Sequence, residues 1–285
     1  MALSSLGQRV ATAVVLVPLV LAALMFLPPL GWALLTLAVV AAAAFEWAHL
    51  ARVGRSAAIG FVLAVIATGL FLLFANALHF SQGWPDPVVF AICGVAALFW
   101  IVIAPAWLAR QWATSSPFAM LVIGGVVLVA TWVAIVDLQA HSPWLVLAAM
   151  ATVWIADTAA YFTGRRLGKR KLAPTISPNK SWEGVWGGLA AVALYALVLV
   201  PLASAAGYAG SRHALALATF IAFAVGLGAI SVVGDLYESL LKRHAGVKDS
   251  GSLLPGHGGV LDRIDALLAA MPLAALAAAV VLDKA

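Results

Sequence analysis

The sequence predicts an all-helical (all-α) integral membrane protein, a polytopic bundle of about nine transmembrane helices. Hydrophobic residues make up 65% of its 285 residues and charged residues only 9%, whereas soluble domains are nearer half apolar and a quarter charged. The mean hydropathy is +1.08, and long apolar runs recur along the chain. These features exclude a water-soluble enzyme, a disordered protein and a disulfide scaffold, and the unbroken runs do not fit a transmembrane barrel.

Nine runs are long enough to cross a bilayer, which takes roughly 20 apolar residues in a helix. The first run follows Arg9 and has a signal peptide as its alternative reading, but it is long for one, and the next run begins just after Pro28 and Pro29. The predicted spans cover residues 10–27, 31–48, 57–78, 88–108, 117–137, 144–163, 184–206, 213–234 and 263–282.

Positive charge is distributed very unevenly between the two sides that these spans define. Fourteen of the 16 Lys and Arg residues fall on the side of the N-terminus, and only Arg212 and Lys284 fall on the other. Lys and Arg favour the cytoplasmic side of membrane proteins. We therefore expect a multi-pass protein of the cytoplasmic (inner) membrane, with the N-terminus and the active-site loops in the cytoplasm.

The two halves of the chain differ in their acidic residues. Only Glu46, Asp86 and Asp137 lie in the first half, whereas the other eight of the 11 acidic residues follow, mostly in two clusters. We therefore expect a transmembrane scaffold of about five spans at 1–142 and a catalytic region of about four spans, with charged loops, at 143–285.

The first polar cluster lies at the end of the sixth predicted span. Asp157 sits about two helical turns inside that end, where a carboxylate costs roughly 2.5–3.5 kcal/mol to insert and marks a functional site by default. An Asp paired with a basic residue to hold the bundle is the alternative. The basic loop 164–171 that follows is also explained as an anchor to anionic lipid. In the next stretch, 174–184, Ser177 and Lys180 belong to a rigid polar loop whose donors suit phosphate oxygens.

The second polar cluster joins the eighth and ninth predicted spans. If the eighth helix continues beyond its apolar run, Asp235, Ser239 and Lys242 lie on one face at i, i+4 and i+7. Asp262 and Asp265 share a face at the start of the ninth span, where the helix dipole favours anions. Both clusters therefore place acidic and basic groups at the same membrane face.

Clustered carboxylates repel one another unless a cation neutralises them. Oxygen-only ligands suit Mg²⁺, which keeps waters and substrate phosphates in its coordination shell. The candidate metal ligands are Asp157, Asp235, Asp262 and Asp265. The basic residues that could pair with a polyphosphate are Lys180, Lys242, Arg243, Lys248 and Arg263. With the flexible glycines of 256–259, this set predicts metal-assisted phosphoryl or nucleotidyl transfer.

The second cluster resembles the signature of the phosphatidate cytidylyltransferases, or CDP-diacylglycerol synthases. The similar positions are 239–243, 248–249 and 255–265, and in the first cluster 156–158 and 176–184. Asn179 and Ala266 depart from the family pattern, but neither departure removes a candidate ligand.

This resemblance implies a nucleotidyltransferase of phospholipid biosynthesis that converts CTP and phosphatidate (phosphatidic acid) to CDP-diacylglycerol and pyrophosphate. The lipid phosphate would attack the α-phosphorus of CTP. The resemblance also implies Mg²⁺ as cofactor and a homodimer in the lipid bilayer. A second, monovalent cation such as K⁺ is left open, and no nucleic-acid partner is expected.

The resemblance implies roles for the site residues. The expected catalytic set is Asp235, Asp262, Lys242 and Asp265. Asp235 and Asp262 would be the first metal ligands, with Asp265 and Ser239 beside them. Asp157 would serve a second cation or orient a base.

Basic and hydroxyl side chains would hold the substrates. The residues implied for the triphosphate or the lipid phosphate are Lys242, Arg243 and Lys248. Ser177 and Lys180 would shape the nucleotide loop. His257 would either contact a phosphate or support its glycine-rich loop.

Other functions stay open at this point. A CTP-dependent kinase of a polyprenol or similar lipid alcohol would use a comparable charged site and differ in its product. A transporter would show broken helices and inverted halves, whereas these halves differ in charge. A membrane scaffold would leave the four converging carboxylates unexplained.

Overall fold

The computed structural model confirms the helical membrane fold. It describes residues 5–76, 82–112, 116–205, 214–253, 256 and 258–282. Within these ranges, eight helices are long and apolar enough to cross a membrane. A further helix at the N-terminus ends in the shorter apolar stretch Val14–Phe26.

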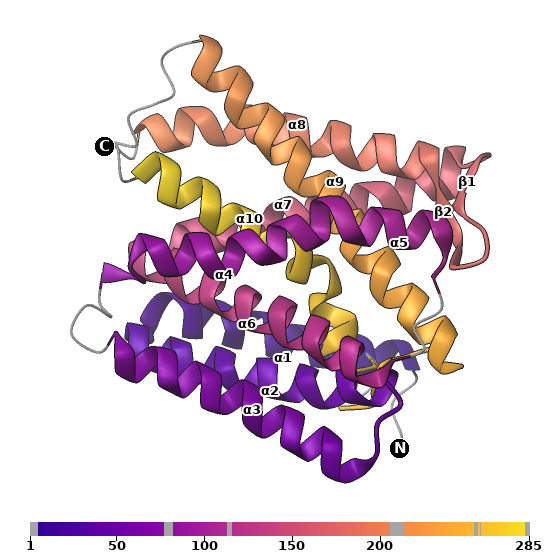
Figure 1. Ribbon diagram of the computed structural model, residues 1–285. Coiled ribbons are helices and arrows are strands. Elements are labelled where there is room, and N and C mark those ends of the chain that lie inside the picture. Colours follow the sequence, from indigo (N-terminus) through magenta and orange to yellow (C-terminus); the bar gives the residue numbers. More distant parts are fainter. Residues whose placement is uncertain are drawn as a thin grey trace.

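The helices follow the predicted spans closely (Figure 1). They are α1 (Ser5–Phe26), α2 (Pro29–Leu50), α3 (Arg55–Ala75), α4 (Asp86–Leu98), α5 (Ala104–Arg110), α6 (Pro117–His141), α7 (Pro143–Leu167), α8 (Trp182–Ala205), α9 (Ala214–Ala245) and α10 (Leu261–Leu282). A π-helical turn at Phe99–Ile103 joins α4 to α5, so the two form one span. Pro105 follows this turn, and the wider turn accommodates a residue that lacks an N–H and crowds the preceding carbonyls.

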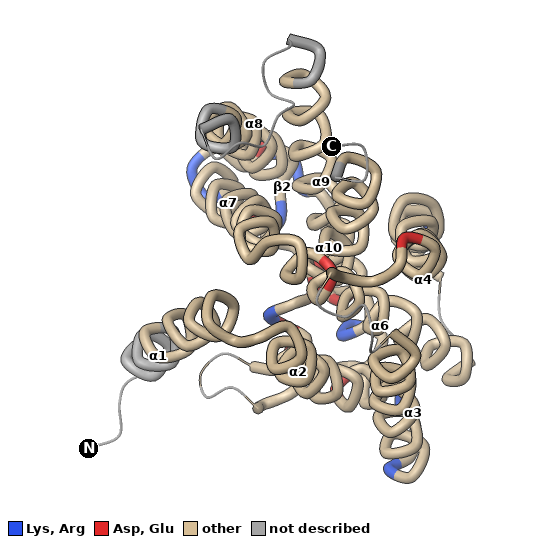
Figure 2. Tube along the Cα trace, turned by 90° about the vertical axis from the view of Figure 1, so that its left-hand side faces the viewer, with Lys and Arg blue, Asp and Glu red and all other residues tan. Residues whose placement is uncertain are grey.

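Helix α10 is the central element of the bundle. Figures 1 and 2 show α1, α2 and α3 on one side and α7 and α8 on the opposite side, with α6 and α10 between them. Helix α10 packs against α9, α6 and α4, and its Ala266, Ala269 and Ala270 are buried. Small residues of this kind let helices approach closely in a membrane. The start of α10, which carries two of the candidate carboxylates, is therefore held on several sides.

The segment between α7 and α8 differs from the polar loop that the sequence predicts. It forms a two-stranded antiparallel hairpin of β1 (Lys171–Ala173) and β2 (Ser177–Ser181). Ile176, in the turn of this hairpin, is buried against Leu236 and Leu240 of α9. The polar strand β2 lacks the alternating apolar residues that would reveal a half-buried strand in a sequence. The buried isoleucine therefore fixes the hairpin on α9.

Helices α7 and α8 pack closely because glycines of α8 face the backbone of α7. A Cβ atom on Gly184 would lie 2.8 Å from the carbonyl oxygen of Ala160, and one on Gly188 would lie 2.7 Å from that of Ala156. Neither position leaves room for a side chain. The close contact brings the hairpin and the polar end of α7 to the same place.

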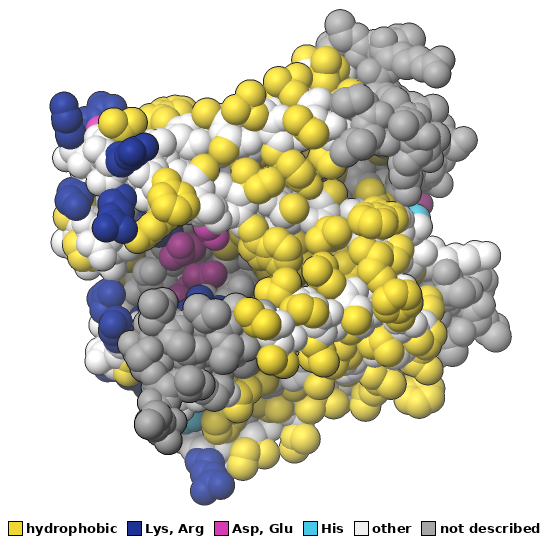
Figure 3. Space-filling view, turned by 180° about the vertical axis from the view of Figure 1, so that it is seen from behind, with side chains coloured by type: hydrophobic (Ala, Val, Ile, Leu, Met, Phe, Trp, Pro, Cys, Tyr) yellow, Lys and Arg dark blue, Asp and Glu magenta, His cyan; other side chains and the backbone are white. Residues whose placement is uncertain are grey.

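The outer surface has the character of a lipid-facing protein. Large apolar side chains such as Phe71, Phe74 and Val122 are exposed, and a hydrophobic band covers much of the face in Figure 3. Lys and Arg side chains gather at one end of this face, and acidic side chains are visible in a recess beside them (Figure 3). The charged end of the bundle is therefore where a polar site is accessible.

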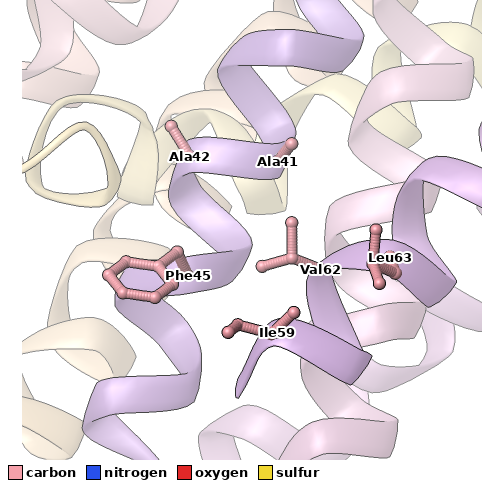
Figure 4. A pocket seen from close by; sticks show the side chains of 6 residues that line it. All are labelled: Ala41, Ala42, Phe45, Ile59, Val62 and Leu63. Carbon is pink, nitrogen blue, oxygen red and sulfur yellow. The ribbon is translucent and has the colours of Figure 1, made fainter. Parts of the chain in front are cut away.

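An apolar groove of about 330 Å³ lies between α2 and α3 (Figure 4). Its lining residues are Ala41, Ala42, Phe45, Ile59, Val62 and Leu63. These side chains offer no group that could bind a phosphate or a metal ion, so this groove is not the candidate site.

Candidate active site

The continuation of α9 builds one wall of the site. This helix has 32 residues, roughly 48 Å at 1.5 Å per residue, and it extends well past the predicted end of its span at 234. Asp235 and Ser239 therefore lie on one face, as predicted, and the Ser239 hydroxyl donates to Asp235 Oδ1 at 3.3 Å. Lys242 follows on the same face of the helix.

Strand β2 brings the first polar cluster to the second. The Lys180 ammonium lies 2.5 Å from Asp235 Oδ2, and both side chains are about one-quarter exposed. Asp157 of α7 is exposed, and its charge interacts with those of Asp235 and Lys180. The structure thus unites residues that the sequence places in two separate stretches.

Lys242 lies at the centre of the second group of charges. Its ammonium is 2.6 Å from Asp262 Oδ1 and also pairs with Glu238, one turn earlier on α9. Glu238 is only 1% exposed, and its Oε1 has no hydrogen-bond partner among the described residues. This glutamate is not among the predicted site residues, although its i−4 spacing from Lys242 places it on the same polar face.

Asp262 is held by the loop that precedes α10. Its Oδ2 accepts the backbone N–H groups of Ser250 at 2.9 Å and Gly259 at 2.8 Å, and the Ser250 hydroxyl lies 3.0 Å away. Gly258 has a φ of +81°, and a Cβ there would lie 2.8 Å from Asp262 Oδ2. Only glycine passes this point without strain. The loop therefore fixes the orientation of the Asp262 carboxylate, and Lys242 binds its other oxygen.

Asp265 lies one turn further along α10 and connects the two groups of charges. Its charge interacts with those of Asp235, Lys180 and Lys242. Its Oδ1 also accepts the backbone N–H of Ala266 at 2.7 Å. The four predicted carboxylates therefore belong to one electrostatic network with two lysines.

Glu46 of α2 is a second residue that the sequence analysis did not assign to the site. It is 5% exposed and accepts the backbone N–H of Val260 at 3.0 Å and that of Leu261 at 2.8 Å. It stands alone in an Ala-rich apolar span. The rule that a membrane-embedded carboxylate marks a functional site, applied to Asp157, would have found Glu46 as well.

The remaining predicted residues lie around this network. Arg243 donates from Nε to the carbonyl oxygen of Ile176 at 3.2 Å, so it holds the hairpin turn. Ser177 is half-buried at the start of β2, and Arg263 is exposed at the start of α10. Lys248 is exposed and forms no ion pair with any residue that the structure describes.

His257, which the sequence predicts to contact a phosphate or to support its loop, lies outside the described residues.

A groove of about 560 Å³ lined by Phe162, Arg165 and Arg166 lies at the end of α7. Guanidinium groups beside an aromatic ring suit the phosphate and the apolar part of a lipid.

The donor chemistry of the network fits Mg²⁺. All the candidate ligands are carboxylates, and Mg²⁺ needs only one or two of them because it keeps waters and substrate phosphates. No three His, Cys, Asp or Glu side chains of the described part are arranged as a ready cage, and Asp235 and Asp262 each bind a lysine. The site therefore matches a metal that is bound together with an anionic substrate.

Comparison with known proteins identifies the family. Residues 7–281 match the Cytidylyltransferase family. The chain is 37% identical over 282 residues to a phosphatidate cytidylyltransferase of Haemophilus influenzae, which covers 94% of this chain and 96% of that protein. The chain belongs to the phosphatidate cytidylyltransferase family.

Two further phosphatidate cytidylyltransferases support this assignment. The protein of Pseudomonas aeruginosa is 41% identical over 274 residues, which cover 94% of each chain. That of Thermotoga maritima is 45% identical over 127 residues, or 43% of this chain and 44% of that protein. Membership in the phosphatidate cytidylyltransferase family confirms the enzyme class that the sequence motifs predict.

Proposed function

We propose that this chain performs the cytidylyltransferase reaction of its family at the network of Asp235, Lys242 and Asp262, with CTP and phosphatidate as substrates and CDP-diacylglycerol and pyrophosphate as products. The observation that carries this assignment is the convergence of four carboxylates and two lysines from α7, β2, α9 and α10. They meet at the polar end of an otherwise hydrophobic bundle (Figure 3).

The reaction requires charge neutralisation and alignment more than proton transfer. A phosphate oxygen of phosphatidate forms a bond to the α-phosphorus of CTP, and the bond from that phosphorus to the bridging oxygen breaks to release pyrophosphate. The phosphate monoester is already ionised near neutral pH, so no general base is required. The residues of the site have to hold two anions in line and balance their negative charge.

Lys180 and Lys242 are suited to receive these anions. Each ammonium binds a carboxylate of the site, Asp235 for Lys180 and Asp262 for Lys242. An entering triphosphate competes with these carboxylates for the lysines. Binding of the triphosphate would therefore release Asp235 and Asp262 from the lysines, so that both carboxylates could bind a metal ion together with the nucleotide.

Asp235 and Asp262 would hold Mg²⁺, with Asp265 and Asp157 beside them. When bound, the ion would neutralise charge on the triphosphate and stabilise the leaving pyrophosphate. The backbone N–H groups of Ser250 and Gly259 donate to Asp262 and fix the orientation of its carboxylate before any ligand binds. Asp157 and Asp265 add negative charge around the same point and allow a second cation.

The recess gives each substrate a route to the site. Acidic side chains are visible between the Lys- and Arg-rich end and the hydrophobic band (Figure 3), so a lipid phosphate at headgroup depth and a nucleotide from water reach the same place. We place this end in the cytoplasm because Lys and Arg favour that side. We also propose a homodimer, as the family resemblance implies.

The test is an assay of the purified protein with CTP labelled at the α-phosphate, phosphatidate and Mg²⁺, with and without a chelator. We expect metal-dependent transfer of label into the lipid together with release of pyrophosphate. Transfer of the γ-phosphate to a lipid alcohol, with no label from the α-phosphate, would contradict the proposal and indicate a lipid kinase.

A further inference from the structure

Glu46 connects α2 to the start of α10. Glu46 Oε1 accepts the N–H of Val260, and Oε2 accepts the N–H of Leu261. These are N–H groups at the beginning of a helix, which have no partner within the helix itself. The hydroxyl of Ser250 lies 2.9 Å from Oε2 as well. Both oxygens of the Glu46 carboxylate are therefore used by the loop and helix that carry Asp262.

The loop before α10 is shaped around this carboxylate. A Cβ atom on Gly251 would clash with Glu46 Oε1, and one on Gly259 would clash with Glu46 Oε2 and with the Ser250 hydroxyl. Ordinary van der Waals contacts of a Cβ atom are 3.4–4 Å long, and real Cβ atoms essentially never come closer than 3.0 Å. Any side chain at either position would displace the carboxylate, so the chain passes Glu46 in close contact on two sides.

Ser250 connects Glu46 to Asp262. Its hydroxyl lies 2.9 Å from Glu46 Oε2 and 3.0 Å from Asp262 Oδ2. A serine hydroxyl has one proton and donates to one acceptor at a time, while the N–H of Ser250 donates to Asp262 at 2.9 Å. The same residue therefore contacts both carboxylates, and a shift of Glu46 reaches Asp262 through it.

Helix α2 also holds the end of α9. Arg52, just past the end of α2, has a φ of +56° and donates from its guanidinium to the carbonyl oxygen of His244. Helix α2 thus contacts the last turn of α9 through Arg52 and the first turn of α10 through Glu46. The two helix ends that face each other across the Lys242–Asp262 ion pair are held by one element.

We propose that Glu46 is a positioning residue for the reaction, which sets the loop before α10 and through it the orientation of the Asp262 carboxylate. This inference rests on the proposed role of Asp262. Glu46 is assigned a positioning role because its oxygens accept from Ser250, Val260 and Leu261, whereas Asp262 binds the lysine cation that a phosphate can displace. It makes a helix of the N-terminal part a component of the active site.

The test compares Glu46→Gln with Asp137→Asn. Glutamine keeps the size of the side chain but places an NH₂ donor against a backbone N–H donor. Asp137 is a matched control, since it is another buried carboxylate, 1% exposed, on α6. The melting temperature, kcat and KM for CTP are measured for each variant. Electron paramagnetic resonance measures the binding of Mn²⁺ in the presence of CTP.

We expect Glu46→Gln to weaken Mn²⁺ binding and to lower kcat/KM by about 10- to 100-fold, the usual effect of disturbing a partner of a metal ligand. Asp137→Asn should bind Mn²⁺ as the wild type does. Both variants should lose thermal stability, so a lower melting temperature alone does not distinguish them. Wild-type Mn²⁺ affinity in Glu46→Gln would overturn the inference.

A second variant serves if Glu46→Gln does not fold. In Gly251→Ala, the new Cβ meets only the Glu46 side chain among its nearest atoms, and the substitution removes none of the groups that donate to Asp262. We expect the same loss of Mn²⁺ affinity, and wild-type affinity would again contradict the inference. Asp262→Asn distinguishes a failure of this inference from a failure of the proposed function. If Asp262→Asn keeps wild-type Mn²⁺ binding and activity, the proposed active site is wrong. If Asp262→Asn loses both while Glu46→Gln and Gly251→Ala behave as the wild type, only the positioning role of Glu46 is wrong.

Discussion

Acidic side chains occur at both ends of this bundle, and they are paired in different ways. Toward the C-terminal end of α6, Asp137 accepts the backbone N–H of Trp84 at 2.9 Å, and its nearest basic group is His141, one turn away on the same helix. At the charged end, Asp235 and Asp262 instead bind the lysines of a strand and of a neighbouring helix.

This difference separates a structural acid from a functional one. The partners of Asp137 are a fixed backbone group and a neighbour on its own helix, so nothing in that pair can be exchanged for a ligand. The lysines of the charged end are long side chains that can transfer from a carboxylate to an incoming phosphate. A carboxylate in the bundle is suited to bind a ligand itself when its partners are cations that can be released, and the following predictions test this distinction.

The largest effect should come from Lys242→Met. This substitution removes the cation that Glu238 and Asp262 share, and breaking a buried ion pair in this way costs about 3–5 kcal/mol. We expect a clear fall in melting temperature and a loss of activity of about 10²-fold or more. Lys248→Met is the control for stability, because Lys248 is exposed; an equal fall in melting temperature there would refute the central position of Lys242.

The pair of Lys180 and Asp235 should show coupled losses. Single substitutions Lys180→Met and Asp235→Asn should each lower activity, and the double variant should lose less than the product of the two single losses. Coupling energies between contacting residues are about 0.5–3 kcal/mol. Strictly multiplicative losses in kcat/KM would show that hairpin and helix act independently.

A smaller effect is expected for Ile176→Ala, which removes the buried anchor of the hairpin on α9. Truncating a buried isoleucine costs about 2–5 kcal/mol, and here the cost falls on the element that carries Lys180. We expect KM for CTP to rise more than kcat falls. Ile59→Ala, at a 46% exposed position of α3, is the control, and a KM unchanged in both variants would count against the hairpin's role.

The smallest effect should come from Asp137→Asn. We expect activity within about twofold of the wild type. Asp137 lies away from the charged end, and its local hydrogen bond contributes to the stability of the fold rather than to the reaction. The melting temperature should fall because the N–H of Trp84 loses a charged acceptor. A folded but inactive variant would mean that the site has been placed at the wrong end of the bundle.

The fold was largely predictable from the sequence. Each predicted span is an apolar run about as long as the helix that crosses a bilayer. All nine runs correspond to helices among the described residues, with α4 and α5 joined as one span. The continuation of α9 was also predictable, because Asp235, Ser239 and Lys242 follow a helical period.

The parts of the site that were missed depend on contacts between distant segments. Glu46 and Leu261 are 215 positions apart in the chain, and no local pattern connects them. The hairpin was hidden because Ile176 is its single buried apolar contact at the turn and β2 is polar. Glu238 lay on a face already recognised, but a glutamate next to a basic helix end is also typical of an exposed ion pair.

The most direct test of the account is Asp262→Asn, assayed with α-labelled CTP and phosphatidate beside Asp137→Asn. Asparagine keeps the volume of the side chain and removes the charge that Lys242, Ser250 and Gly259 hold in place. The account predicts a folded protein that transfers about 10²- to 10³-fold less label to the lipid, while the control stays near the wild type. Wild-type transfer by Asp262→Asn would contradict the account.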